Sequence, residues 1–250
     1  MASPIISPLS LSEHVGAVFD KPVYNNYSFA SYNMHGFRQG ISLLKDILCD
    51  PSELNISFAC IQENWLTPQN LIKMDSLVNY NFYGKSAMES SLSTSVLRGR
   101  PWGGVGILVR QDLCCKISFQ QCEDRFAIVA FDNILLISIY LPSGSSEVVI
   151  DIVADTLSLL EATIKKFPDY FIICGGDFNA NLTTSSPVKL IINKFMQDND
   201  LGICDQTFSK NANILNYTYC HEALKHYSYI DYFLVSKSMF NQVLDFNLLY

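Results

Sequence analysis

Short apolar runs alternate with amphipathic stretches along most of the 250-residue chain. The runs predict strands, because they are rich in β-branched and aromatic side chains and end at turn residues. We expect strands at about 27–34, 56–62, 79–84, 104–110, 116–123, 125–131, 134–142, 170–175, 229–236 and 243–248. The consecutive runs between 116 and 142 predict a β-meander, in which Asp132-Asn133 forms a hairpin turn.

The amphipathic stretches repeat apolar residues at the spacing of one helix face. One helix is expected from residue 37 onward, with an apolar stripe formed by Phe37, Ile41, Leu44 and Leu48. Thr67-Pro68 and Ser186-Pro187 each place a capping residue before a proline, which predicts helices ending near residues 77 and 200. The longest helix is expected at 147–167. Strands and helices mixed in this way predict a layered α/β protein with mixed sheets.

The composition shows no repeat, low-complexity linker or break after residue 26, so one domain is expected over 27–250. Residues 1–26 are expected to form a loosely ordered leader. This segment lacks the basic start of a secretory signal, and the eight cysteines, which form no C-x-x-C pair, are expected as buried free thiols. No apolar stretch predicts a membrane span. We therefore expect an intracellular protein, nuclear or cytoplasmic and not secreted.

The charge narrows the classes of partner. The chain is 49% hydrophobic and 16% charged, which is typical of a folded globular protein. Its formal net charge is −7, with a pI of about 5.0. That balance excludes a simple polybasic nucleic-acid binder, because the chain as a whole repels phosphate. A phosphate ester substrate would need a local basic region or a metal cation.

Polar side chains recur where the predicted strands end, at Asn33, Glu63, Tyr140, Asp177, Asn179 and Asp231. Each also has an ordinary structural reading, since Asn and Asp are common turn residues and tyrosine is common in cores. Two carboxylates are harder to explain in that way. Glu63 follows a short apolar strand, and Asp231 lies within another apolar strand, so each needs a hydrogen-bonding or cationic partner.

Taken together, these side chains supply carboxylate and amide oxygens without a cysteine or histidine cluster. That donor set favours Mg²⁺ or Mn²⁺ over zinc. Phosphodiester hydrolysis suits such a site, because a bound cation neutralises a phosphate oxygen while amide and hydroxyl donors hold the phosphoryl group.

Six motifs contain these residues, in the order SYNMHG (31–36), IQE (61–63), GGVGI (103–107), IYLP (139–142), GDFN (176–179) and SYIDY (228–232). In this order the motifs resemble the endonuclease/exonuclease/phosphatase superfamily. The resemblance is greatest to the apurinic-type endonuclease domain of LINE-type non-LTR retrotransposons, and it spans roughly residues 27–236.

The resemblance implies a four-layer α/β sandwich of two mixed β-sheets flanked by helices. It implies Mg²⁺-dependent endonuclease nicking of DNA at a retrotransposon target site, and it suits a parent polyprotein that carries a reverse transcriptase domain. The implied roles are metal binding by Glu63 with Asn33 beside it, water activation by Asp177, phosphate contacts by Asn179 and Tyr140, and orientation of a histidine by Asp231.

Three positions depart from the family pattern. His35 stands where relatives often have Asn or Asp, which suggests an indirect role, and Ser143 stands where they often have Asn. Ser228 opens the last motif, but the closing Ser-Asp-His motif is absent and no histidine follows Asp231. We therefore expect impaired hydrolysis by this chain, which would be restored by a downstream segment that supplies the motif.

Basic residues cluster in one segment. The stretch 85–110 has a local net charge of +3, against −10 for the rest of the chain. Lys85, Arg98 and Arg100 are therefore candidates for contacts with the DNA backbone, although an ordinary solvated loop would look the same. Two other functions stay open: a non-catalytic truncated remnant, and a phosphatase or phosphodiesterase of the same fold that acts on a small phosphoester.

Overall fold

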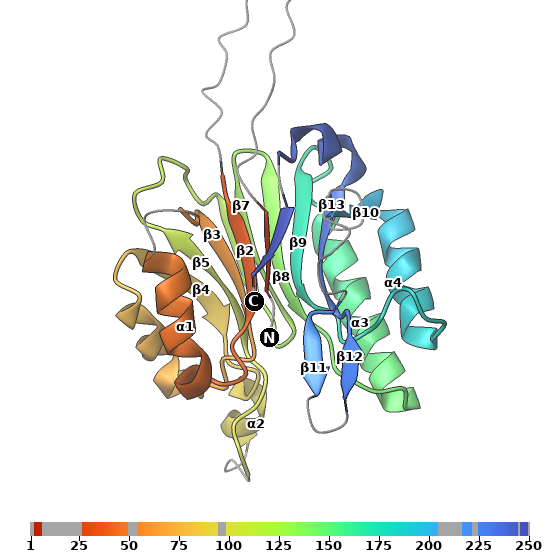
Figure 1. Ribbon diagram of the computed structural model, residues 1–250, viewed down its shortest axis with the longest axis horizontal. Coiled ribbons are helices and arrows are strands. Elements are labelled where there is room, and N and C mark those ends of the chain that lie inside the picture. Colours follow the sequence, from red (N-terminus) through yellow and green to blue (C-terminus); the bar gives the residue numbers. More distant parts are fainter. Residues whose placement is uncertain are drawn as a thin grey trace, which may run out of the picture.

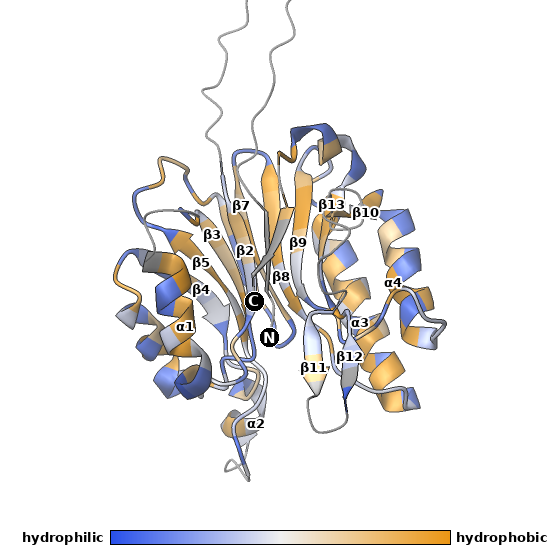
Figure 2. Ribbon diagram, in the orientation of Figure 1, coloured by the Kyte–Doolittle hydropathy of each residue, from blue (hydrophilic) through white to orange (hydrophobic). Residues whose placement is uncertain are grey.

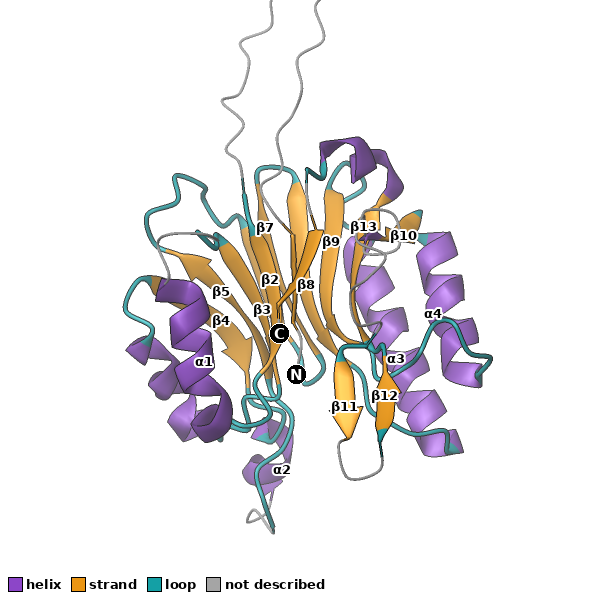
Figure 3. Ribbon diagram, viewed as in Figure 1, coloured by secondary structure: helices purple, strands orange, loops and turns teal. Residues whose placement is uncertain are grey.

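The computed structural model consists of two six-stranded β-sheets packed face to face, with helices on both outer sides (Figure 1). Figure 3 shows these four layers as helix, strand, strand and helix. The fold is therefore the expected four-layer α/β sandwich. The structure describes residues 3–6, 27–49, 55–94, 99–204, 217–221, 225–244 and 246–249.

The first sheet has the strand order β14-β1-β2-β3-β5-β4. Its strands are β1 (Ser3–Ile6), β2 (Phe29–Asn33), β3 (Phe58–Gln62), β4 (Tyr80–Lys85), β5 (Val105–Arg110) and β14 (Phe246–Leu249). Only the β2–β3 pair is parallel. Apolar side chains of α1 (Phe37–Cys49) and of the 3₁₀ helix η1 (Pro68–Ser76) cover its outer face.

The second sheet has the strand order β10-β13-β9-β8-β7-β6. Its strands are β6 (Phe119–Cys122), β7 (Phe126–Phe131), β8 (Ile134–Tyr140), β9 (Phe171–Asp177), β10 (Leu201–Ile203) and β13 (Asp231–Ser236). Here β8 and β9 are the parallel pair. The long helices α3 (Glu147–Ile164) and α4 (Pro187–Asp198) pack on its outer face.

The inner core lies between the sheets and is aromatic. Phe58 stacks on Phe131 of the opposite sheet with ring centroids 4.2 Å apart, and Phe29 stacks on Phe58. Figure 2, a ribbon coloured by hydropathy, shows hydrophobic residues concentrated on the strands of both sheets. Burial of one such ring contributes roughly 1.5–3 kcal/mol, so this core fixes the two sheets relative to each other.

Smaller elements extend the sandwich. Helix α2 (Glu89–Thr94), strands β11 (Tyr219–His221) and β12 (His226–Ser228), and the 3₁₀ helix η3 (Lys237–Gln242) lie outside the two sheets. The β11–β12 hairpin and α2 project beyond the sheets at the same end of the molecule (Figure 1). In the described part of the chain, no helix is long and apolar enough to cross a membrane.

The local turn and cap predictions are largely confirmed. Asp132 and Asn133 both have positive φ, 43° and 60°, as a hairpin turn of the expected kind requires. The Ser186 hydroxyl accepts from the Lys189 amide and caps α4. The Thr67 hydroxyl instead accepts from the Asn70 side chain at 2.7 Å and makes no cap bond, so the expected α-helix there is the 3₁₀ helix η1.

Three expectations need correction. The leader predicted over 1–26 is not wholly irregular, because Ser3–Ile6 pair with both β2 and β14 and complete the sheet; residues 7–26 lie outside the described part of the chain. No strand was expected between residues 175 and 229, yet β11 and β12 pair there as a hairpin. Strand β10, which no pattern predicted, pairs with β13 directly after α4.

Candidate active site

The strand register brings the predicted polar residues to one edge of the sandwich. Because β2 and β3 are parallel with Asn33 opposite Gln62, Asn33 and the next residue, Glu63, lie at the same sheet end. In the other sheet, Asp177 lies between Tyr140 of β8 and Asp231 of β13. The two sheets thus present two rows of polar side chains at facing edges.

The Asn33 amide joins the two rows. Its Nδ2 donates to Glu63 Oε1 at 2.9 Å within the first sheet and to Asp177 Oδ2 at 2.9 Å across the interface. Its Oδ1 accepts from the backbone amide of His35 at 3.0 Å. The amide nitrogen therefore faces the carboxylates and the oxygen faces away. This orientation makes Asn33 a spacer between two carboxylates and differs from that expected of a direct metal ligand.

Unusual backbone geometry is concentrated at this edge. His35, Glu63, Trp65 and Asn179 all adopt left-handed conformations, with φ between 48° and 51°. Such values are uncommon for residues other than glycine, and Glu and Trp have little local reason to adopt them. Specific bonds hold the turns, including Gly36 N to the Glu63 carbonyl at 2.8 Å. Strain of this kind gathers at functional sites more often than elsewhere.

The turn after β3 also fixes the Glu63 side chain. Trp65 Nε1 donates to Glu63 Oε2 at 3.0 Å, so each carboxylate oxygen of Glu63 accepts one hydrogen bond. An ionised carboxylate oxygen has further lone pairs. Glu63 is therefore held in one orientation and can still bind a cation.

The second row consists of buried acids. Asp177 and Asp231 are 3% and 7% exposed. Burial raises the pKa of Asp177 well above its ordinary value, and the charge of Asp231 raises it further; bonds from the Asn179 amide and Asn33 oppose the shift. Burial also raises the pKa of Asp231 to about 7, while a hydrogen bond with Thr218 lowers it. Two adjacent carboxylates that resist ionising together need a proton or a cation between them.

Tyr140 and Arg125 complete this row. Burial, followed by the charges of Glu63 and Asp177, raises the pKa of the Tyr140 hydroxyl, so it remains a hydrogen-bond donor at neutral pH. The Arg125 guanidinium lies over the rings of Tyr140 and Trp102, at 5.4 and 5.8 Å from their centroids. Burial lowers the pKa of Arg125, and the charges of Tyr140, Asp124 and Glu63 oppose that shift. A cation thus stands beside the acids.

Asn179 ends the GDFN motif in a fixed position. Its backbone amide donates to Asp177 Oδ1 at 2.8 Å, and its Nδ2 donates to the Leu141 carbonyl at 2.8 Å. A side-chain amide carries two N–H hydrogens. One of them is used by Leu141, which leaves the second to contact a bound oxyanion.

The donor set suits a hard divalent cation. Among the described residues, no three His, Cys, Asp or Glu side chains are placed to enclose a metal ion. A closed zinc centre is therefore not formed by these residues, whereas Mg²⁺ keeps most of its waters and needs only one or two protein carboxylates. The half-buried Glu63, with Asp177 held near it by Asn33, meets that requirement.

Other predicted site residues lie around this centre. The His35 residue is exposed, and its ring packs on Trp65 with centroids 5.1 Å apart. Its contact with the site is the hydrogen bond from its backbone amide to Asn33, which in turn bonds the acids. Ser143 is exposed in the loop after β8. Ser228 ends β12, and its carbonyl accepts from the Thr218 amide at the base of the hairpin.

The basic residues expected to contact the DNA backbone do not lie together in the structure. Lys85 Nζ lies 3.1 Å from Asp124 and 3.7 Å from Glu89, so its charge is already neutralised and it is a poor candidate for a DNA contact. Arg110 pairs with Asp112 at the opposite end of β5. Arg98 lies outside the described residues. Among the described basic residues of this segment, Arg100 reaches the site, with its guanidinium 4.9 Å from the centroid of the Trp65 ring.

Three contributors were not identified from the sequence: Trp65, Arg125 and Thr218. Trp65 directly follows the Glu63 motif, and its polar N–H needs a partner when buried, so its proximity was a usable signal. Arg125 precedes a β-strand with no distinguishing pattern. The Thr218 hydroxyl accepts from the amides of Ile230 and Asp231, a contact between segments that no sequence spacing indicates.

A family profile matches most of the chain. The profile described as the Endonuclease/Exonuclease/phosphatase family matches residues 30–245. That span includes both rows of polar side chains. A search of curated proteins finds no match.

Solved structures share the fold at low sequence identity. An AP endonuclease from Archaeoglobus fulgidus is 17% identical with a TM-score of 0.61, over 84% of this chain and 86% of that one. A 3′ phosphatase from Neisseria, bound to a product DNA hairpin, is 14% identical with a TM-score of 0.61, over 85% and 88%. The endonuclease domain of TRAS1, a telomere-specific non-LTR retrotransposon, is 14% identical with a TM-score of 0.58, over 86% and 87%.

Proposed function

Since the chain belongs to the endonuclease/exonuclease/phosphatase family, we propose that it is a phosphoester hydrolase whose substrate is DNA and whose cofactor is Mg²⁺ or Mn²⁺. The likeness to AP endonucleases and to the TRAS1 endonuclease domain supports nicking within a strand, as at a retrotransposon target site. The observation that carries the proposal is the Asn33 amide, which holds Glu63 and the buried Asp177 at a fixed separation across two sheets.

Glu63 would hold the metal ion, which when bound neutralises charge on a non-bridging phosphate oxygen. Asp177 would orient the attacking water and accept its proton, since burial and Asp231 raise the pKa of this carboxyl. Hydrolysis then forms one P–O bond to the water oxygen and breaks the ester bond. The leaving oxygen takes a proton from solvent water, and Asp177 later returns its proton to solvent.

Donors around the acids would hold the phosphoryl group as charge develops on it. Tyr140 keeps its proton and can donate to a phosphate oxygen, and the second N–H of Asn179 can do the same. Arg125, stacked on Tyr140, adds a positive charge. Asp231 would favour protonation of Asp177 and keep the Thr218 segment in place.

The test is conversion of supercoiled plasmid to the nicked form, with protein in excess and Mg²⁺ present. Nicking should require the metal and should disappear in Glu63→Gln. Glu147→Gln is a matched control, because Glu147 is exposed at the start of α3 on the outer face of the other sheet. Equal nicking by wild type and Glu63→Gln would contradict the proposal.

A further inference from the structure

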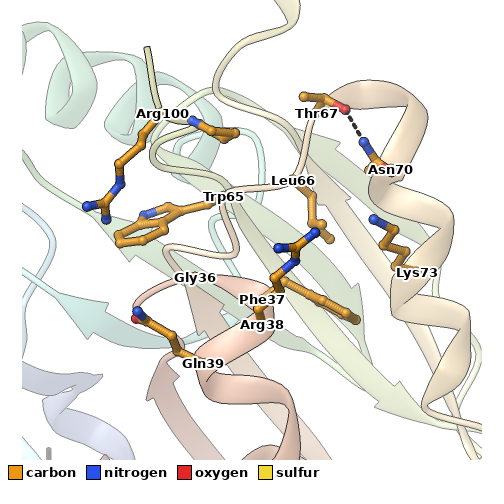
Figure 4. Close-up of a pocket in the computed structure, with 11 residues that line it drawn as sticks. Gly36, Phe37, Arg38, Gln39, Trp65, Leu66, Thr67, Asn70, Lys73 and Arg100 are labelled. Carbon is orange, nitrogen blue, oxygen red and sulfur yellow. Dashed lines mark hydrogen bonds between the residues drawn. The ribbon is translucent and has the colours of Figure 1, made fainter.

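A pocket of about 490 Å³ lies beside the candidate active site, on the far side of Trp65. Figure 4 shows its walls, which come from the start of α1, the segment after Glu63, η1 and the Arg100 loop. Trp65 is the shared wall, because it lines the pocket and its indole N–H donates to Glu63. An occupant of this pocket would therefore sit one side chain away from the proposed metal ligand.

The pocket is electropositive. Arg38, Lys73 and Arg100 line it from three different elements, and all three are exposed. No Asp or Glu is among its lining residues, and in the described part of the chain no salt bridge involves these three cations. The 13-residue helix α1 also begins here, which adds the positive end of its dipole. The overall charge of the protein is −7, so this concentration is local.

The remaining walls suit a nucleobase. A pocket of this size exceeds the needs of a phosphate group alone and falls in the range of small-molecule sites, about 300–1,000 Å³. Phe37, Leu66 and Pro101 provide apolar surface, and the Gln39 and Asn70 amides lie at its margin. Asn70 is oriented by its bond to Thr67, drawn as a dashed line in Figure 4.

Stacking of a base on Trp65 is disfavoured by what already covers the ring. Arg100 lies over the indole, and Gly36 packs so closely that an added Cβ would come within 2.5 Å of it. The base of a bound nucleotide would therefore contact the Phe37 and Leu66 side of the pocket.

We propose that this pocket binds one unpaired nucleotide of the substrate strand, with its phosphate on Arg38, Lys73 and Arg100 and its base against Phe37, Leu66 and Pro101. This inference rests on the proposed function, because it assigns the pocket to the same DNA. A nucleotide can enter only when it is out of the base stack. The pocket would therefore favour cleavage sites that lie next to a single-stranded or distorted segment.

The direct test uses Trp65 fluorescence in a Trp102→Phe background, because the chain has only two tryptophans. Deoxyadenosine monophosphate is titrated in EDTA, so that no hydrolysis is needed. We expect a saturable change in Trp65 emission, because Trp65 and the Arg100 side chain over its ring both line the pocket. Inorganic phosphate should bind about tenfold more weakly, because it leaves the apolar walls empty. Absence of a saturable change, or equal affinity for phosphate and nucleotide, would overturn the proposal.

Variants assign the signal to the pocket. Arg38→Ala/Lys73→Ala should weaken nucleotide binding at least tenfold and reduce the salt slope of single-strand binding by about 0.7, the value for one lost phosphate contact. Lys45→Ala is the matched control, since Lys45 is exposed on the same helix and does not line the pocket. Thermal melting checks that each variant folds. Equal losses in the double variant and in Lys45→Ala would overturn the assignment.

The outcomes separate this proposal from the proposed function. Plasmid nicking without nucleotide binding would reject the pocket and leave the hydrolase proposal intact. Nucleotide binding without nicking would reject hydrolysis by this chain and leave the pocket assignment intact.

Discussion

The two edges that form the candidate site are built differently. On the first sheet, Glu63 is half-buried and has a left-handed backbone conformation. Each of its carboxylate oxygens accepts a hydrogen bond from a side-chain N–H donor. On the second sheet, Asp177 and Asp231 are buried in regular strands, and the pKa of each is raised. The contrast indicates two roles: the first edge presents a carboxylate to a cation, and the second edge accepts and releases protons.

The largest expected effect comes from replacing either of two acids, one on each edge, by its amide. Glu63→Gln and Asp177→Asn should each lower plasmid nicking by about a hundredfold or more, because each removes a charge used in the transition state. They should differ in metal response. Excess Mg²⁺ should partly restore Glu63→Gln, whose defect is binding, and should leave Asp177→Asn inactive. If nicking by the two variants depended on Mg²⁺ concentration in the same way, the proposed difference between the two edges would be rejected.

The bridge between the edges is tested by Asn33→Asp. This change replaces a donor to two carboxylates with a third carboxylate, which should cost about 3 kcal/mol of unfolding free energy in EDTA. Mg²⁺ should recover much of that loss by neutralising the cluster. Urea unfolding with and without metal measures both quantities. Asn81→Asp, at an exposed position of β4, serves as control and should change little.

Asp231 should make the free energy of unfolding depend on pH. Its folded pKa of about 7 exceeds the ordinary value of 3.8, so the folded state holds this proton more tightly than the unfolded chain does. The resulting stability is present below pH 4 and is lost as the pH rises through 7. Asp231→Asn cannot ionise, so it should be more stable than wild type at pH 8 by about 1–3 kcal/mol.

Urea unfolding in EDTA at pH 5 and pH 8 measures that difference. Asp151→Asn, on the exposed face of α3, should follow the wild-type pH dependence. A stability difference between Asp231→Asn and wild type that is independent of pH would show that Asp231 is already ionised in the folded protein.

The smallest expected effect comes from removing the hydrogen bond that Trp65 donates to Glu63. Trp65→Phe keeps an aromatic ring, though a smaller one, and removes the N–H donor to Glu63 Oε2, a bond worth about 1.5–3 kcal/mol when its acceptor is charged. Part of that loss is compensated by water, so Mg²⁺ affinity should change only severalfold. A calorimetric titration measures it. A change as large as that of Glu63→Gln would mean that Trp65 does more than orient the carboxylate.

The sequence allowed the architecture and the strand-end residues to be predicted for one physical reason. Apolar runs fix the strands, and parallel pairing then aligns their ends, which is why Asn33 and Glu63 meet at one edge. The hairpin turn at Asp132-Asn133 could also be predicted, because it depends on two adjacent residues that tolerate positive φ.

What could not be predicted depends on contacts between distant segments. The neutralisation of Lys85 needs Asp124 from the other sheet, and the pairing of β1 with β14 joins the two ends of the chain. The direction of the Asn33 amide depends on the left-handed turns at His35 and Glu63, which those residue types do not signal. The basic pocket also depends on distant contacts, because four separate segments of the chain form its walls.

The central claim is that the Glu63 edge holds a divalent cation in front of the buried acids, and Mg²⁺ titration by calorimetry tests it most directly. Wild type and Glu147→Gln should show the same saturable binding, and Glu63→Gln should bind at least about tenfold more weakly, since a lost charge–ligand contact is worth more than 1.4 kcal/mol. Equal affinity in wild type and Glu63→Gln, or no saturable binding in wild type, would contradict the claim.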